Sequence, residues 1–340
     1  GPSERHMDWR PFNPQMRPPF EDLLDRFTPD LVHFHCVQRL TASVVEAVRA
    51  RGIPYVVTAH DAWWISDYQF LTDRDGSVVS SSHDPLGDAS DPAQGPMASI
   101  ARRRRLKQIL DAAAAICAVS ETFAEVYRQA GFPRTIAIPN GVTRLAPVVR
   151  RPCATGRVRL GHIGGRTLHK GATLIETVLK ASRFSHLALT MVDHTLSTDQ
   201  VIEEIWGTTP VRIIGNVPQD QVGTLYAEMD VLLAPSLWPE SFGLVTREAQ
   251  ASKVWVVASD RGAIGDEIAE GVNGFRIDVS SPAGLRAVLT RIEAEPNRFL
   301  NIPPAPETPM RTASDQGKDL IALYDRLLRP SIERMASNSP

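Results

Sequence analysis

Two glutamates, Glu240 and Glu248, stand on either side of a Ser-Phe-Gly step in the stretch PSLWPESFGLVTREA. The apolar run VLLAPS before them is typical of a buried strand, and we expect a helix to begin near Gly243. The backbone amides of Phe242, Gly243 and Leu244 would then point out of the positive end of that helix, where anionic oxygens are favoured. Carboxylates accept hydrogen bonds from vicinal hydroxyls. The spacing therefore favours a phosphate on backbone amides with a sugar on each side, as in a nucleotide sugar.

A second candidate site lies in LGHIGGRTLHKG, where an apolar strand runs into Gly164 and Gly165. Glycines let the backbone approach a ligand closely. The two cations that follow, Arg166 and Lys170, are four residues apart and suit a diphosphate. The alternative for this stretch is an ordinary surface turn with solvated charges, and for the two glutamates it is a solvated loop and helix face.

These residues need a scaffold, and the chain supplies alternating strand and helix patterns. The β-prone segments of the first half are PDLVHFHC, IPYVVTAHD, AAICAVS and RTIAIPNGV, and those of the second half are RVRLGHIG, LALTMVD, VRIIGNV, DVLLAPS, VWVVAS and GFRID, with helical periodicity between most of them. This alternation predicts parallel βαβ units and two doubly wound Rossmann-like domains. A Pro- and Arg-rich stretch, Arg144–Arg157, is interpreted as the linker, and the polar stretch Ser66–Pro96 as a loop or insertion.

The predicted domains follow from this division. Residues 1–7, GPSERHM, are typical of a cloning scar. The N-terminal domain is predicted over 8–146 and the C-terminal, ligand-binding domain over 147–310. A final amphipathic helix and tail occupy 311–340.

Composition narrows the class of function. The net charge of −2 gives no reason to expect a nucleic-acid partner. Three cysteines, Cys36, Cys117 and Cys153, are too few and scattered for a disulfide framework or a zinc site, and Cys36 and Cys117 are expected to be buried. No apolar run approaches the roughly 20 residues that span a bilayer. A cytoplasmic location is the expectation.

Together these motifs resemble the retaining GT-B glycosyltransferases of the large family 4 type, also known as glycosyl transferases group 1. PESFGLVTREA matches that family's Glu-x7-Glu signature, and GGRTLHKG matches its GR-x3-KG motif after a strand. PDLVHFH, VVTAHD, AVS, IPNGV, IIGNV and GVNGF follow in the family's order. The resemblance covers Pro29 to Leu328, and the ordered set is specific although each piece is weak.

The resemblance implies a donor site in the second domain. Arg166 and Lys170 would neutralise the donor diphosphate, next to the glycines of their turn. Glu248 would hold the ribose hydroxyls. Glu240 would contact the donor hexose near the amides of Phe242, Gly243 and Leu244.

It also implies a reaction. His60 of the AHD motif would lie near the transferred sugar, and the region of Val217 would touch the base. The last helix would cross back to the first domain. The family is assigned front-face attack with retention of configuration, so we assign no covalent nucleophile; neither a metal nor a cofactor is expected. The donor would be a UDP- or GDP-linked sugar and the acceptor a glycan or a lipid-linked glycan, in a bacterial type of surface-polysaccharide synthesis.

The sequence also departs from the family. Family members usually begin with a strand and a glycine-rich loop, tens of residues, and from the resemblance we expect this segment to be absent before PDLVHFH. This keeps a truncated, non-catalytic nucleotide-binding module as an alternative, beside another GT-B enzyme such as a sugar-nucleotide epimerase. The run Arg102–Arg105 is interpreted as a solvated helix face or a contact with the inner face of a membrane. His33 and His35 are expected to be packed or cleft-lining histidines rather than metal ligands, and Trp63–Trp64 to be core or a sugar platform.

Overall fold

The computed structural model describes residues 10–73, 76–80, 95–143, 153, 155–304 and 310–337, with the backbone alone after residue 329. The predicted scar, and parts of the predicted linker and of the Ser66–Pro96 loop, lie outside the described residues. The chain divides into two compact units. Unit 1 comprises 1–73, 79–140 and 313–340, and unit 2 comprises 74–78 and 141–312.

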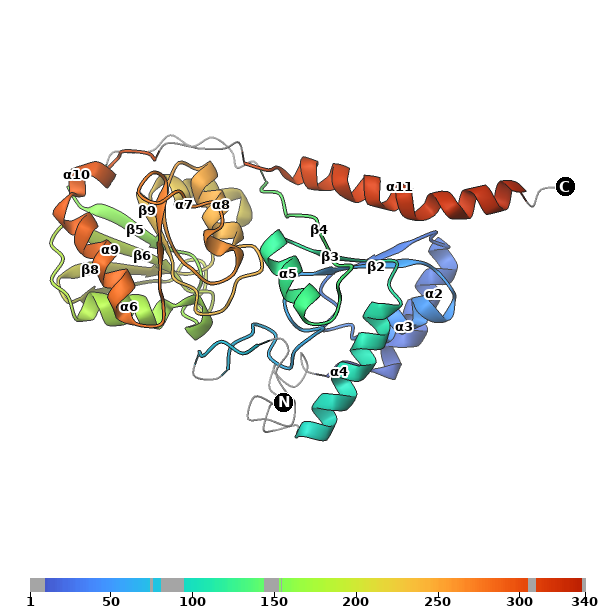
Figure 1. Ribbon diagram of the computed structural model, residues 1–340. Coiled ribbons are helices and arrows are strands. Elements are labelled where there is room, and N and C mark those ends of the chain that lie inside the picture. Colours follow the sequence, from blue (N-terminus) through green and yellow to red (C-terminus); the bar gives the residue numbers. More distant parts are fainter. Residues whose placement is uncertain are drawn as a thin grey trace. The chain divides into compact units, whose positions relative to one another are not determined.

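Unit 1 is built on a four-stranded parallel sheet in the order β1-β2-β3-β4 (Figure 1). Its strands are Val32–Phe34, Tyr55–Ala59, Ala115–Ala118 and Ile136–Ala137. Every residue of β2 is buried, as its unbroken apolar sequence predicts for a strand covered on both faces. The helices of the unit are α2 (Arg17–Phe27), α3 (Ser43–Ala50), α4 (Pro96–Asp111), α5 (Glu121–Gln129) and α11 (Ala313–Ser337).

Helix α11 packs on the sheet of unit 1 although it is the last element of the chain. Leu323 is 3% exposed and joins one apolar cluster with Val56, Cys117 and Ile138. Leu320 and Leu327, three and four residues away, extend the same helix face, as the helical period requires. The helix runs from 313 to 337, longer than the Asp315–Leu328 core of its apolar pattern.

Unit 2 contains a seven-stranded sheet in the order β11-β10-β9-β5-β6-β8-β7. The strands are β5 (Val158–His162), β6 (Leu187–Val192), β7 (Val201–Trp206), β8 (Thr209–Ile214), β9 (Val231–Ala234), β10 (Trp255–Ser259) and β11 (Gly274–Ile277). All pairs are parallel except β7 with β8, which form an antiparallel hairpin. The carboxyl ends of the parallel strands therefore share one edge of the sheet.

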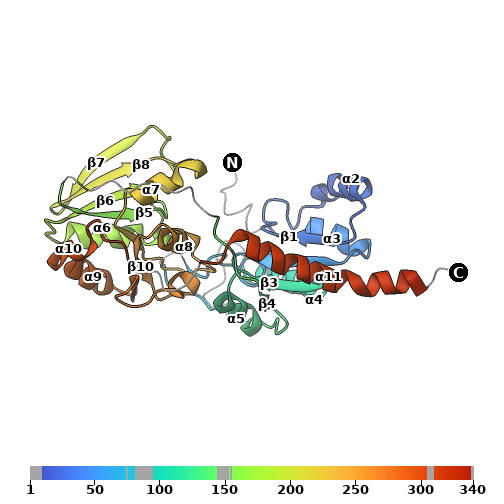
Figure 2. The same ribbon diagram turned by 90° about the horizontal axis from the view of Figure 1, so that it is seen from above.

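Helices cover both faces of this sheet (Figure 2). On one face lie α6 (Ala172–Lys180), α9 (Pro282–Ala294) and α10 (Pro296–Phe299), which bury Ile175, Leu289 and Phe299 completely. On the other lie α7 (Val222–Ala227) and α8 (Leu244–Ala251), packed through a second cluster. The prediction of a doubly wound α/β fold is thus confirmed.

Strand β7 is not among the predicted strands. It is an edge strand, and Val201, Ile202 and Ile205 are 46%, 39% and 73% exposed. Five of its six residues are exposed or half-buried, so the strand shows no alternation of buried and exposed positions and its sequence gives no period-2 signal. Helices α2 and α9 were also missed, whereas the predicted helix near Gly243 is confirmed as α8.

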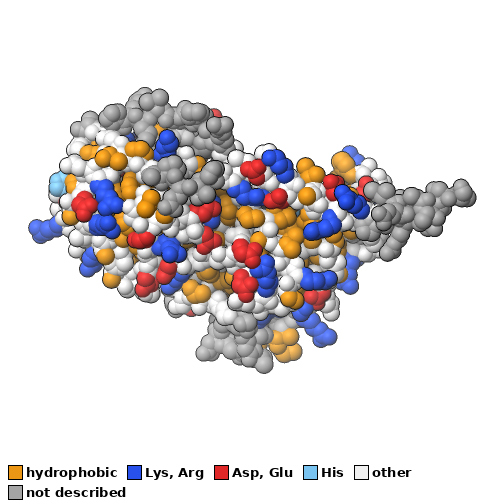
Figure 3. Space-filling view, turned by 45° about the horizontal axis from the view of Figure 1, so that its top comes forward, with side chains coloured by type: hydrophobic (Ala, Val, Ile, Leu, Met, Phe, Trp, Pro, Cys, Tyr) orange, Lys and Arg blue, Asp and Glu red, His pale blue; other side chains and the backbone are white. Residues whose placement is uncertain are grey.

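Two surface observations bear on partners. On the face shown in Figure 3, Lys and Arg side chains are interspersed with Asp and Glu side chains. In the part of the chain that the structure describes, no helix combines the length and apolar character needed to cross a membrane.

Candidate functional site

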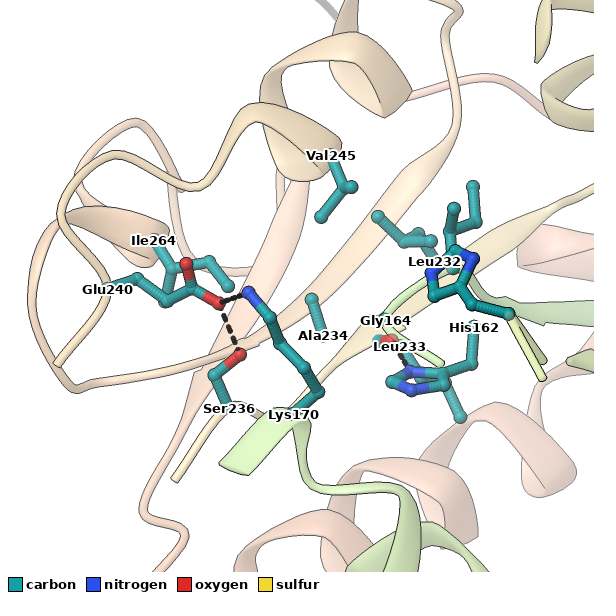
Figure 4. A pocket seen from close by; sticks show the side chains of 12 residues that line it. His162, Gly164, Lys170, Leu232, Leu233, Ala234, Ser236, Glu240, Val245 and Ile264 are labelled. Carbon is teal, nitrogen blue, oxygen red and sulfur yellow. Dashed lines mark hydrogen bonds and ion pairs between the residues drawn. The ribbon is translucent and has the colours of Figure 1, made fainter. Parts of the chain in front are cut away.

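A pocket of about 120 Å³ opens in unit 2 at the carboxyl ends of β5 and β9 (Figure 4). Ligands of open parallel sheets bind at this edge. Its walls come from β5, β9, the loops that follow them and β6, the first turn of α8 and the 3-10 helix Ala263–Gly265. The residues that line it are His162, Ile163, Gly164, Lys170, His194, Leu232, Leu233, Ala234, Ser236, Glu240, Val245 and Ile264.

The polar centre of the pocket is a bonded group of three side chains. Lys170 Nζ lies 2.6 Å from Glu240 Oε1, and Ser236 Oγ donates to the same oxygen at 2.7 Å. Figure 4 shows the lysine side chain extended toward this carboxylate. The Glu240 side chain is 7% exposed and that of Lys170 is 29% exposed. Two residues that the sequence predicts as separate ligand contacts are therefore bonded to each other.

Backbone geometry fixes both partners of this ion pair. Lys170 ends a short 3-10 helix, Leu168–Lys170, and Gly171 follows with φ +78°. A Cβ on Gly171 would lie 2.0 Å from the carbonyl oxygen of Pro235, so only glycine fits between the two loops. On the other side, Glu240 forms an isolated parallel bridge with Gly262, and its carbonyl accepts from the Ala263 amide at 2.7 Å.

The Gly164–Gly165 turn lies close to two histidine rings. A Cβ on Gly164 would lie 2.9 Å from His162 Cε1, and one on Gly165 would lie 2.8 Å from His194 Cδ2. Gly165 also has φ +74°. Both glycines thus permit a close approach of the histidine rings that a larger residue would block, while their contact with a ligand stays a prediction.

His162 is a pocket residue that the sequence analysis did not single out. It is 1% exposed, with Nδ1 2.8 Å from the Leu233 carbonyl and Nε2 3.2 Å from the Gly165 carbonyl. Burial lowers the pKa of this imidazole, opposed by the two carbonyls. The neutral ring has one N–H, so it donates to one of these carbonyls at a time. His194, also missed, contacts Asn216 Oδ1 through Nδ1 at 2.5 Å.

Helix α8 begins at Leu244, with Gly243 as its N-cap at φ +78°. Arg247 holds this start in place: its Nη1 donates to the Phe242 and Ala263 carbonyls, and its guanidinium lies 4.0 Å from the Phe242 ring centroid. Arg247 is 4% exposed, and burial lowers its pKa. A buried arginine next to Glu248 could not be distinguished by sequence from an exposed helix-face charge.

Glu248 is 6% exposed and accepts a hydrogen bond from the Tyr226 hydroxyl at 3.0 Å through Oε2. Burial raises the pKa of this carboxyl, and the Tyr226 bond acts in the opposite direction. Glu248 is outside the set of residues that line the pocket, but Val245, three residues earlier on the same helix face, is in it.

The other predicted donor-site residues are not among the residues that line the pocket. Arg166 is exposed, with Nη2 3.6 Å from Glu176 Oε2. Phe242 is 6% exposed, and Leu244 is 45% exposed at the helix tip. Val217 is half-buried and packs against the apolar cluster beneath α7 and α8.

In unit 1, His60 follows β2 and is part of a row of three histidines. His35 Nδ1 lies 2.8 Å from His60 Nε2, and the His33 and His35 ring centroids are 4.3 Å apart. His33 is bonded to Thr58 and Tyr324, so it is a packed histidine as expected. Burial lowers the pKa of His33 and of His60 to about 4, with a further lowering by the neighbouring histidine charges.

Three interpretations of unit 1 are decided by burial. Trp63 and Trp64 are 1% and 5% exposed, so both belong to the core. Arg102 is 4% exposed and donates to the Trp63 and Ser66 carbonyls, so the predicted solvated arginine face is wrong at this position. Cys117 is buried as expected, whereas Cys36 is exposed, because it lies beyond the end of β1.

Two family comparisons cover most of the chain. Residues 157–302 match the family described as Glycosyl transferases group 1, and residues 2–141 match the Glycosyl transferase 4-like domain. Among solved structures, the chain is similar to sucrose-phosphate synthase from Thermosynechococcus elongatus, with a TM-score of 0.63 and 18% identity over 96% of this chain and 78% of that one. It is also similar to Anabaena HepE in complex with UDP-glucose, with a TM-score of 0.60 and 17% identity over 95% and 83% of the two chains.

Curated relatives match over shorter segments. The D-inositol 3-phosphate glycosyltransferase of Thermomonospora curvata is 41% identical over 88 residues, 26% of this chain and 20% of the relative. That of Corynebacterium urealyticum is 29% identical over 144 residues, 42% of this chain and 34% of the relative. The matched segments thus span about a third or less of these relatives.

Two Rossmann-like units with a polar pocket at the strand ends of the second one define the GT-B class of fold, which the structural neighbours share. Within that class, the chain belongs to the glycosyltransferase family with a 4-like domain followed by a group 1 domain.

Proposed function

We propose that this chain transfers a sugar from a nucleoside-diphosphate-sugar donor to a glycan or lipid-linked acceptor, with retention of configuration and without a metal. The observation that carries the proposal is the Lys170–Glu240–Ser236 group in the strand-end pocket of unit 2, beside the Gly164–Gly165 turn. A cation suits the diphosphate, and a carboxylate suits a sugar hydroxyl. The names of the relatives, and the UDP-glucose complex of HepE, support the same class of reaction.

The roles follow from the chemistry that glycosyl transfer requires. A departing diphosphate must be stabilised, and Lys170 can do this because its ammonium has three N–H donors, of which Glu240 takes one. Arg166 and the amides at the start of α8 are proposed to contact the same phosphates. Glu240 is proposed to bind the donor hexose, and in the described part of the chain its Oε2 accepts no hydrogen bond.

The remaining contacts belong to the same proposal. Glu248 holds the ribose, Val217 touches the base, and His60 acts at the transferred sugar. Lowering of its pKa by burial makes His60 neutral at pH 7, so it can exchange hydrogen bonds with a sugar hydroxyl. The acceptor hydroxyl passes its proton to a donor phosphate oxygen, so the reaction requires no covalent nucleophile on the enzyme. A cytoplasmic location, with the acceptor presented at the inner face of a membrane, completes the proposal.

Calorimetric titration with UDP and GDP, each in turn, tests the donor site. A charge-assisted hydrogen bond contributes roughly 1.5–3 kcal/mol, so Arg166→Ala should weaken binding at least about tenfold. Arg212→Ala on β8, also an exposed arginine of unit 2, is the matched control and should leave affinity unchanged. If neither nucleotide binds the unsubstituted protein, or if the two variants behave alike, the donor-site assignment is wrong.

Metal independence is tested separately by assaying sugar transfer, or donor hydrolysis in the absence of acceptor, with and without EDTA. Because side-chain cations are assigned to the diphosphate, turnover should be the same in both conditions. Loss of turnover on chelation with recovery on adding Mg²⁺ or Mn²⁺ would contradict the proposal.

A further inference from the structure

The Tyr226 hydroxyl is placed between two acceptors at the buried junction of α7 and α8. It lies 3.0 Å from Glu248 Oε2 and 3.2 Å from the Val245 carbonyl. Tyr226 is fully buried, and Glu248 is 6% exposed. A phenol has a single proton to donate, and a carboxylate is the stronger acceptor. The hydroxyl therefore donates to Glu248, at the shorter of the two distances.

This hydrogen bond uses Oε2 of the Glu248 carboxylate, so Oε1 is the oxygen that remains for another partner. In the described part of the chain, Glu248 Oε1 takes part in no hydrogen bond. Oε1 is not among the buried side-chain atoms of the described chain that lack a partner, so water or a ligand can reach it. Glu248 also lies one helical turn beyond Val245, which lines the pocket, so its side chain is on the pocket face of α8.

We propose that Tyr226 is a positioning residue, whose hydroxyl fixes one oxygen of Glu248 so that the other accepts hydrogen bonds from the ribose hydroxyls of the donor. The inference rests on the proposed function, because it takes a nucleotide as the ligand. It extends that function by assigning a role to a residue that touches neither substrate nor phosphate.

The bond also favours the ionised form of Glu248, which is the form that accepts from both hydroxyls of a ribose. Burial raises the pKa of this carboxyl, and the Tyr226 hydrogen bond lowers it. Removing the hydroxyl removes the lowering influence alone. The carboxyl then takes up a proton at a higher pH, and a protonated carboxyl has one fewer acceptor site for the ribose.

The test is a double-mutant cycle of Tyr226→Phe and Glu248→Gln, measured as the Kd of UDP or GDP by calorimetry. Tyr226→Phe should weaken binding about five- to tenfold, because one hydrogen bond to a charged group is lost. In the Glu248→Gln background the same change should have little further effect, because Tyr226 acts through the carboxylate. Tyr55→Phe is the matched control: Tyr55 is also a buried tyrosine, but its hydroxyl donates to the Ile109 carbonyl in unit 1.

The pH dependence of Kd separates positioning from general destabilisation. As pH is lowered, protonation of Glu248 weakens binding, and this acidic limb of the plot of affinity against pH should lie at higher pH in Tyr226→Phe. In Tyr55→Phe the limb should lie where it does in the unsubstituted protein. Additive losses in the cycle, or an unmoved limb, overturn the inference while leaving the donor site standing. Absence of nucleotide binding by the unsubstituted protein refutes the proposed function instead.

A second variant covers the case in which the phenylalanine protein does not fold. Replacing Tyr226 by 3-fluorotyrosine keeps the hydroxyl and makes it a stronger donor, so Kd should fall and the acidic limb should move to lower pH. An unchanged Kd and limb in this variant also overturn the inference.

Discussion

We propose two separable roles for the Lys170–Glu240 ion pair: the pair stabilises unit 2, and its lysine binds the donor diphosphate. One set of substitutions can distinguish them. Replacing Lys170 by Met removes the cation and leaves a carboxylate that is only 7% exposed. Removing one partner of a fully buried pair costs about 3–5 kcal/mol. Lys170 is 29% exposed, so water relieves part of this cost, and we expect a loss of about 2–3 kcal/mol.

For a unit of this size that loss corresponds to a fall in Tm of about 5–10 °C for the unfolding transition of unit 2. Adding Glu240→Gln to Lys170→Met removes the unpaired charge and keeps an oxygen that accepts from Ser236. The double variant should therefore recover most of the lost stability. It should not recover nucleotide affinity, because the cation proposed to bind the diphosphate is still missing.

Lys180→Met is the matched control, because the ion pair of Lys180 has the same nitrogen–oxygen distance as that of Lys170. The Lys180 ammonium lies 2.6 Å from Glu176, but its side chain is 54% exposed. Exposed helix pairs contribute about 0.5 kcal/mol or less, so its Tm should hardly change. Differential scanning calorimetry gives the stabilities, and titration with UDP or GDP gives the affinities. The reasoning is refuted if Lys180→Met is as harmful as Lys170→Met, or if the double variant is no more stable than Lys170→Met.

Three further predictions follow from the same structure. Gly171→Ala should destabilise unit 2 by about 3 kcal/mol or more, because its Cβ would lie 2.0 Å from the Pro235 carbonyl oxygen. Gly156→Ala is the control: Gly156 also has a positive φ, +68°, but a Cβ there meets no described atom within 4 Å. Thermal melts of Gly156→Ala should show a loss of only about 1 kcal/mol from backbone strain. Glu240→Ala or His60→Ala should lower turnover by ~100-fold or more, as kinetics would show. By calorimetry the nucleotide Kd should be little changed in His60→Ala and no weaker in Glu240→Ala, which removes a negative group beside Lys170. Turnover near that of the unsubstituted enzyme would refute the assigned roles. The stability of unit 1 should fall as pH falls from about 6.5 to about 4, because the unfolded chain binds protons there that half-buried His33 and His60, with pKa values of about 4, do not. Urea melts of the His33→Asn protein should show a shallower pH dependence than those of His186→Asn, an exposed-histidine control; equal slopes would contradict it.

The fold was largely predictable because its signals are local. Strand β9, VLLA, is apolar throughout, as a central parallel strand covered by helices on both faces must be. The start of α8 was predictable because Gly243 interrupts the pattern at its N-cap. Strand β7 was not predictable, because Val201 and Ile205 are apolar yet exposed, and a periodicity argument assumes that apolar residues are buried.

The candidate site was predictable in its residue types but not in its bonding. Motif spacing selected Lys170, Glu240 and Glu248, and the pocket contains the first two. His162, Arg247 and Tyr226 were missed because what distinguishes them is burial and a distant partner. The partner of Tyr226, for example, is 22 residues away on another helix, a separation that no local pattern encodes.

The bonding changes how donor affinity must be understood. Lys170 is not an unpaired cation, because its ammonium already lies 2.6 Å from Glu240 Oε1. In the proposed donor site, a diphosphate would therefore share the ammonium with that carboxylate, and its negative charge would approach a second negative group. The gain from Lys170 is correspondingly smaller than that of a free lysine, which leaves the amides at the start of α8 and Arg166 to contribute the remainder. A sugar hydroxyl that donates to Glu240 would offset this repulsion, so an intact nucleotide sugar should bind unit 2 more tightly than the same nucleoside diphosphate, and Glu240→Gln should reduce that preference.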